Sequence, residues 1–135
     1  MARVVSVVGV SHNPFHYRLI SQPRPQWSQD IVNMVERGEL LREKLKKGNP
    51  QSLVIVGNDH FHQFFMDNMP AFIIGKMDLF DGTYYNEVRE FALPRCKVPG
   101  DPELAQQILE GSLKRWVDFA FSNELKIDHS VVVPL

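Results

Sequence analysis

The chain has 135 residues, of which 44% are hydrophobic and 23% charged, and its 15 basic and 16 acidic side chains give a formal net charge of -1. This length and apolar content suit one compact globular domain. The even charge balance offers no basic stripe, so we expect no nucleic-acid partner. The single cysteine, Cys96, excludes a disulfide within the chain and favours a cytoplasmic location. The apolar run at 3–10 is too short to span a membrane, so we expect no membrane association.

The first elements along the chain are a strand and a short helix. Residues 3–10 form a continuous run rich in valine, which is typical of a fully buried strand. Asn13 followed by Pro14 favours the start of a helix, with asparagine as the N-cap. This helix must be short, because the two prolines within residues 21–26 predict a loop.

A long helix and a second strand follow. From Ser28 onward apolar residues recur at helical spacing, and Gly48 with Asn49 and Pro50 marks the end of the pattern. Residues 52–56 are again apolar and predict a second buried strand. Two apolar strands joined by a helix indicate a βαβ unit, so we expect an α/β fold with a mostly parallel sheet and helices on both faces.

The second half of the chain is less regular. Residues 70–75 predict a third short strand, and 76–100 are expected to be irregular. Asp101 with Pro102 predicts a helix that runs to about Leu113. Residues 116–125 suit a strand followed by a turn, and 129–135 suit a strand or a buried apolar segment. A domain rarely stops on a run of valines, so we expect the N-terminal part of a longer domain, although docking of this segment as the last element is the alternative.

Two of the five histidines follow the two predicted buried strands. His12 and His60 come just past the carboxyl ends of these strands, where open α/β sheets bind ligands. If the strands are parallel neighbours, the two imidazoles converge. Two imidazoles and one carboxylate form the arrangement that holds non-haem Fe(II) with open positions. The alternative is that both histidines are hydrogen-bonded loop residues.

Neighbouring polar residues are candidates for substrate contacts or for holding metal ligands in place. His62 shares a face with His60 if the chain stays extended there, and it suits a ligand, a substrate contact or a residue at the rim of a pocket. His16 suits a pocket-lining or supporting role, because Pro14 separates it from His12. Asn58 belongs with these substrate-binding or supporting candidates.

Two aspartates directly precede histidines. Asp59 precedes His60 and Asp128 precedes His129. Adjacent strand residues point in opposite directions, so neither aspartate is expected to bind a metal together with its neighbour. A carboxylate that holds a ligand imidazole generally comes from elsewhere in the fold. For both aspartates a turn or cap role and a functional role remain open.

Taken together, four segments resemble one known family. "SHNPF", "VIVGNDHFHQFF", "PAFIIG" and "IDHSVVVPL" occur in the order and spacing of the class III extradiol ring-cleavage dioxygenases. The chain is similar to the catalytic β subunit of protocatechuate 4,5-dioxygenase and to the gallate and methylgallate dioxygenases. The resemblance extends over essentially the whole chain, which would make residues 1–135 one catalytic domain that is incomplete at its C-terminus.

The resemblance implies roles for three histidines. His12 and His60 match the two histidine ligands of a catalytic Fe(2+), and His129 matches a catalytic histidine that contacts the substrate hydroxyls or oxygen near the metal. The family also uses a later glutamate as metal ligand and a further histidine. No glutamate of this chain lies in matching context, whether Glu87, Glu90, Glu103, Glu110 or Glu124.

The expected reaction is Fe(II)-dependent cleavage of a catechol-type aromatic acid of the protocatechuate, gallate or methylgallate class by O2. We expect the segment alone to be inactive, because the anionic metal ligand is missing. The family resemblance also implies a homo-oligomer or pairing with a small α subunit. Two alternatives remain: a non-catalytic metal-binding or scaffold relative, which would need no later glutamate, and a structural subunit whose histidines lie on the surface.

Overall fold

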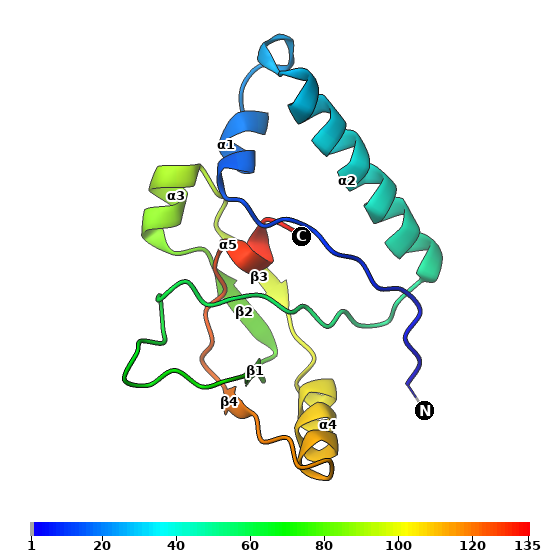
Figure 1. The fold of residues 1–135 in the computed structure, drawn as a ribbon, viewed down its shortest axis with the longest axis vertical. Helices are drawn as coiled ribbons and strands as arrows, with labels where there is room; N and C mark the ends of the chain where they lie inside the picture. The colour runs from blue at the N-terminus through cyan, green and yellow to red at the C-terminus, as the bar shows by residue number, and fades with distance from the viewer. Residues whose placement is uncertain (1) are drawn as a thin grey trace.

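The computed structural model of the chain describes residues 2–135 and shows a mixed α/β fold with two small sheets (Figure 1). The predicted α/β class is therefore confirmed. In chain order the elements are α1 (Phe15–Ile20), the 3-10 helix η1 (Arg24–Gln26), α2 (Gln29–Gly48), β1 (Ile73–Gly75), β2 (Leu79–Gly82), α3 (Tyr85–Phe91), β3 (Cys96–Pro99), α4 (Pro102–Leu113), β4 (Ala120–Ser122) and α5 (His129–Val132).

One sheet is parallel and the other antiparallel. β1 pairs with β4 in parallel, with Ile73 opposite Ala120, and α4 of the connecting segment packs against β1. β2 and β3 pair antiparallel, with Gly82 opposite Cys96. A parallel bridge between Gly82 and Ile127 joins the end of β2 to the segment that leads into α5. The sheets therefore fix the position at which α5 begins.

The two longest helices begin and end where the sequence predicts. The Ser28 side chain accepts a hydrogen bond from the Ile31 amide at the start of α2, and Asn49 ends α2 in the left-handed conformation with φ 45°. Asp101 caps α4 by accepting a hydrogen bond from the Leu104 amide at 2.9 Å. A hydrogen bond from Ser52 and the bond from the Leu104 amide lower the pKa of Asp101 below its usual value. The predictions of the two long helices, α2 and α4, are confirmed.

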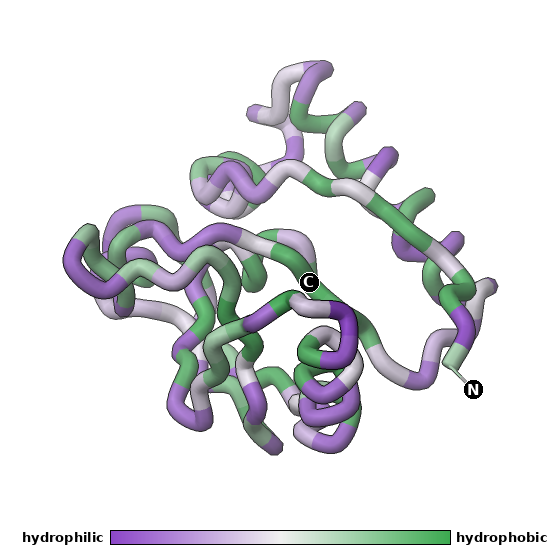
Figure 2. The backbone as a smooth tube through the Cα atoms, turned by 60° about the horizontal axis from the view of Figure 1, so that its bottom comes forward, coloured by the Kyte–Doolittle hydropathy of each residue, from purple (hydrophilic) through white to green (hydrophobic). Residues whose placement is uncertain are grey.

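The predicted strands at 3–10 and 52–56 are wrong. Both segments lack regular secondary structure and pair with no strand within residues 2–135, and they expose apolar side chains such as Val7 (86%) and Val56 (90%). Figure 2 shows the segment that leads to α1 as largely hydrophobic. An apolar run becomes a buried strand only where neighbouring strands pair with it and other layers cover it. The parallel pair of this fold is formed instead by β1 and β4.

Residues 70–75 and 116–125 do contain the predicted strands, β1 and β4. The expectation of an irregular segment at 76–100 is wrong, because this segment holds β2, α3 and β3. Each of these elements has seven residues or fewer, too short for a clear periodic pattern. The C-terminal segment is a short helix, α5, and not a strand. The alternative of a buried apolar segment is confirmed in part, since Val132 is buried.

The interior of the molecule is small and unusually polar. The buried apolar side chains among the described residues are Ile31, Leu93, Ala105, Ile127 and Val132. Equally buried are the polar residues Thr83, Glu87, Asp128, His129 and Ser130, three of which lie at the start of α5. Buried charged groups are costly unless they are paired, so this polar cluster marks a candidate site. No helix within residues 2–135 has the length and apolar character needed to cross a membrane.

Candidate active site

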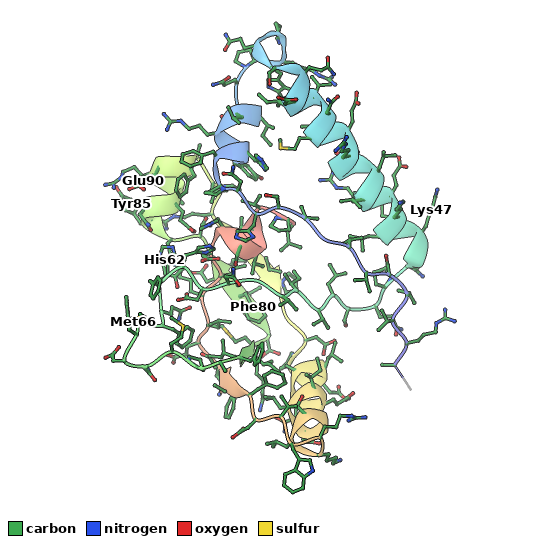
Figure 3. All side chains as sticks on the ribbon, in the orientation of Figure 1. Lys47, His62, Met66, Phe80, Tyr85 and Glu90 are labelled. Carbon is green, nitrogen blue, oxygen red and sulfur yellow. The ribbon has the colours of Figure 1, made fainter. Side chains whose placement is uncertain are left out.

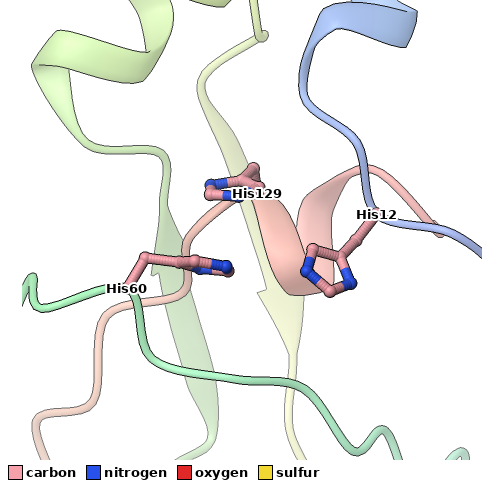
Figure 4. Close-up of side chains that lie close together, drawn as sticks. All are labelled: His12, His60 and His129. Carbon is pink, nitrogen blue, oxygen red and sulfur yellow. The ribbon is translucent and has the colours of Figure 1, made fainter.

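Three histidines from distant parts of the chain meet beside α5 (Figure 4). His12 lies just before α1, His60 follows the extended segment 52–56, and His129 is the first residue of α5. The ring centroids of His12 and His60 are 5.3 Å apart, those of His60 and His129 4.0 Å, and those of His12 and His129 5.8 Å. The predicted convergence of His12 and His60 is confirmed.

The three imidazoles fit a transition-metal ion. One ring nitrogen from each of His12, His60 and His129 lies within 4.8 Å of the other two. Neutral imidazole nitrogens suit iron, zinc and copper, whereas magnesium and calcium prefer oxygen ligands. His12 and His60 are partly exposed and His129 is buried, so the cluster lies at the edge of the packed region.

Asp128 orients His60. The Nδ1 atom of His60 donates a hydrogen bond of 2.8 Å to Asp128 Oδ2, and the Ser130 amide donates one of 2.8 Å to Oδ1. Burial alone would raise the pKa of Asp128, but the hydrogen bonds from Ser130 and His60 outweigh it and lower this pKa below its usual value. The ionised carboxylate fixes the Nδ1–H tautomer of His60, which leaves Nε2 free to bind a metal. Asp128 thus caps α5 and also supports a candidate ligand from elsewhere in the chain.

Glu87 is a residue of this site that sequence reasoning missed. It is fully buried, and its Oε1 atom accepts a hydrogen bond of 3.1 Å from the His129 amide and lies 2.5 Å from His129 Nδ1. The available sequence signal was Phe91, which follows Glu87 by four residues and so lies on the same face of a helix. In the structure the ring centroid of Phe91 lies 6.1 Å from that of His129. The apolar residue at this spacing indicates that Glu87 lies on the inward face of the helix.

His62 lies beside α3 in a second group of side chains (Figure 3). Its ring stacks on Tyr84 at 4.0 Å, and its Nε2 atom is 3.4 Å from Glu87 Oε1. Burial and the nearby carboxylates of Asp59, Asp128 and Glu87 raise the pKa of Tyr84, so its hydroxyl stays protonated at neutral pH. The condition under which His62 would share a face with His60, an extended chain, is not met, because the backbone turns at Phe61 with φ 57°.

The remaining candidates lie at the margin. Asn58 is exposed, and His16 is partly buried in α1; neither belongs to a potential metal-binding group among the described residues. Asp59 accepts a hydrogen bond of 3.3 Å from the Phe64 amide, which is a turn-stabilising contact.

Gly57 allows the segment before His60 to lie close to α5, which gives a testable prediction. A Cβ atom at position 57 would lie 2.7 Å from Ser130 Oγ and 3.2 Å from Ser130 Cβ. We expect Gly57→Ala to displace this segment, weaken the hydrogen bond between His60 and Asp128, and lower the free energy of unfolding by about 1–3 kcal/mol. Chemical denaturation measures the change.

The matched control for this prediction is Gly38→Ala. Gly38 lies within α2, and no described atom lies within 4 Å of the Cβ that the substitution would add. Alanine there is expected to increase stability by up to about 1 kcal/mol, because glycine is a poor helix former. Equal changes in the free energy of unfolding for the two substitutions would show that the close approach of residue 57 to Ser130 does not limit stability.

The chain matches one protein family and several curated proteins. The family described as the catalytic LigB subunit of aromatic ring-opening dioxygenase matches residues 6–135. Similar curated proteins include two enzymes named 2,3-dihydroxyphenylpropionate/2,3-dihydroxicinnamic acid 1,2-dioxygenase. The one from Cupriavidus necator is 30% identical over 89% of this chain and 34% of the relative. The one from Rhodococcus globerulus is 32% identical over 64% of this chain and 26% of the relative. The Dechloromonas aromatica protein that carries the same name followed by the number 2 is 27% identical over 93% of this chain and 36% of the relative.

The chain thus spans about a third of the length of the relatives it matches most fully. The match includes all the histidines of the three-imidazole cluster, since His12, His60 and His129 lie within residues 6–135. The predicted resemblance to extradiol dioxygenases is confirmed, and the chain belongs to the LigB family of catalytic subunits of aromatic ring-opening dioxygenases.

Proposed function

We propose that the protein containing this chain cleaves the ring of a catechol-type aromatic compound at an extradiol bond, using O2 and Fe(II). The observation that carries the proposal is the convergence of His12, His60 and His129 within a chain of the LigB family. Residues 1–135 would then form part of one catalytic domain.

The metal would be held by His12 and His60. Asp128 keeps His60 in the tautomer whose Nε2 is free, and this arrangement raises the basicity of the ligand nitrogen. When bound, Fe(II) would supply a site at which the diol and O2 are held together and electron density passes between them.

The position of His129 supports a proposed role in proton transfer. Its ring lies 4.0 Å from that of His60 and is buried, so a proton moved at His129 would stay close to a diol bound at the metal and away from bulk water. Imidazole suits general acid–base work near neutral pH. We assign His129 this role, and a supporting role to His62.

The third, anionic metal ligand is proposed to come from outside the described residues. Both oxygens of Asp128 accept hydrogen bonds, from His60 and from the Ser130 amide, and Glu87 Oε1 lies against His129, so the carboxylate oxygens nearest to the imidazoles already have partners. A ligand set of two histidines and one carboxylate is the one that suits a non-haem Fe(II) oxygenase.

For the substrate, the printed names of the relatives favour 2,3-dihydroxyphenylpropionate. The resemblance found in the sequence favours the protocatechuate, gallate and methylgallate class. Both are catechol-type acids, and we propose 2,3-dihydroxyphenylpropionate as the first of these to test.

The test is anaerobic Fe(II) reconstitution of the intact protein, followed by addition of O2 and each candidate catechol. The expected result is a yellow ring-fission product, whose yield across the panel identifies the substrate class. Saturable Fe(II) binding without product from any catechol would favour the scaffold reading. Absence of saturable Fe(II) binding would favour a structural subunit.

A further inference from the structure

Glu87 contacts His129 through a single carboxylate oxygen. Glu87 has no exposed surface, and its Oε1 atom contacts both the main-chain amide of His129, at 3.1 Å, and the ring Nδ1, at 2.5 Å. One carboxylate oxygen therefore holds both the backbone and the ring of the histidine. His62 closes the other side, with Nε2 3.4 Å from Glu87 Oε1.

The distance favours a hydrogen bond over joint metal ligation. Two atoms bound at right angles to one ion at about 2.1 Å each lie about 3 Å apart. The separation of 2.5 Å between Glu87 Oε1 and His129 Nδ1 is too short for two ligands of one ion and is that of a short hydrogen bond. Oε1 also accepts a hydrogen bond from the His129 amide, so it is an acceptor at this point, and the proton of the bond to the ring belongs to Nδ1.

The arrangement also carries a cost. Glu87 Oε2 is buried and has no hydrogen-bond partner within residues 2–135. A buried polar atom without a partner destabilises the fold by about 1–3 kcal/mol. A side chain chosen for packing alone would avoid this cost, and strained or unsatisfied groups of this kind concentrate at functional sites.

We propose that Glu87 is a positioning residue that fixes the tautomer and orientation of His129. With the proton on Nδ1, the nitrogen away from Glu87, Nε2, is left unprotonated and able to accept a proton in the site. This inference rests on the proposed function, since it explains how His129 would act in it. α3 thereby contributes to the site although its backbone lies outside the group of three histidines.

The experiment measures the imidazole ¹⁵N shifts of the intact, metal-free protein at one neutral pH, with the His129 signal assigned by His129→Gln. We expect wild-type His129 to be the Nδ1–H tautomer. Glu87→Ala should shift it toward the Nε2–H tautomer that free histidine prefers, and Glu87→Gln should restore Nδ1–H, because the glutamine oxygen can accept the same bond. If Glu87→Ala fails to fold, Glu87→Leu replaces it.

The second readout is kinetic, in the Fe(II)-loaded protein. We expect Glu87→Ala to lower kcat about 10- to 100-fold with iron content and KM nearly unchanged. The control is Glu90→Gln in the same helix, because Glu90 is exposed and pairs with Arg89. Figure 3 shows Glu90 on α3 and His62 below this helix.

The outcomes separate this inference from the proposed function. An Nε2–H tautomer in wild type, or a tautomer unchanged in Glu87→Ala, would overturn the role of Glu87. A wild-type protein that cleaves no catechol would count against the function alone, because the ¹⁵N shifts still decide the role of Glu87.

Discussion

Replacing His60 with alanine is expected to abolish saturable Fe(II) binding by the intact protein, and ring cleavage with it. Loss of a residue that merely supports a metal ligand already costs about 10- to 100-fold in affinity, so loss of a ligand should cost at least that much. His12→Ala should have the same effect, because His12 and His60 lie on one site with ring centroids 5.3 Å apart. Anaerobic titration with Fe(II) measures the change.

His16→Ala is the matched control for these two substitutions. His16 is another partly buried histidine, but it lies in α1 and outside the three-imidazole cluster. The His16→Ala protein should bind Fe(II) with the same affinity as wild type. If His12→Ala and His60→Ala also kept their iron and their activity, the assignment of the ligands would be wrong.

Asp128→Ala is expected to weaken Fe(II) binding about 10- to 100-fold without removing a ligand. The substitution frees His60 to rotate and to change tautomer, because Asp128 accepts the hydrogen bond from its Nδ1 atom. It also removes the N-cap of α5, which costs about 1 kcal/mol of folding free energy. Fe(II) titration and denaturant unfolding measure the two effects separately.

Asp128→Asn distinguishes the effect of the carboxylate charge on His60 from the effect of residue 128 as the N-cap of α5. Asparagine is an equally good N-cap, so α5 should keep its stability, whereas the neutral amide holds His60 less firmly. The folded-state pKa of Asp128 lies below its usual value, so the carboxylate stabilises the fold above about pH 4 and loses this contribution as pH falls through the lowered pKa. Wild type should therefore lose more stability in acid than Asp128→Asn. Identical acid profiles would contradict the stabilising role of the carboxylate.

The sequence is informative where structure depends on local interactions. The ends of α2 and α4 follow from Ser28, Asn49 and Asp101, whose side chains or backbone conformations act within a few residues. The strands at 3–10 and 52–56 were predicted wrongly, because an apolar run leaves open which neighbours will pair with it. Strand pairing is non-local, and no periodic pattern encodes it.

In the candidate site, too, the sequence identifies some residues and misses others that depend on non-local contacts. His12 and His60 do meet, although the parallel strands on which the prediction depended are absent from the described residues. They meet because both segments lead to the start of α5, where Asp128 binds His60. Glu87 was not selected among the glutamates, because its spacing to Phe91 is informative only if residues 85–91 are recognised as a helix, and this segment was expected to be irregular.

The most direct test is anomalous X-ray diffraction at the iron edge from crystals of the intact, Fe(II)-loaded protein. We expect one iron peak within bonding distance of ring nitrogens of both His12 and His60, with His129 beside it and Glu87 hydrogen-bonded to His129. An iron peak on His62 and Glu87 that leaves His12 and His60 unbound, or no peak near the three imidazoles, would contradict this expectation.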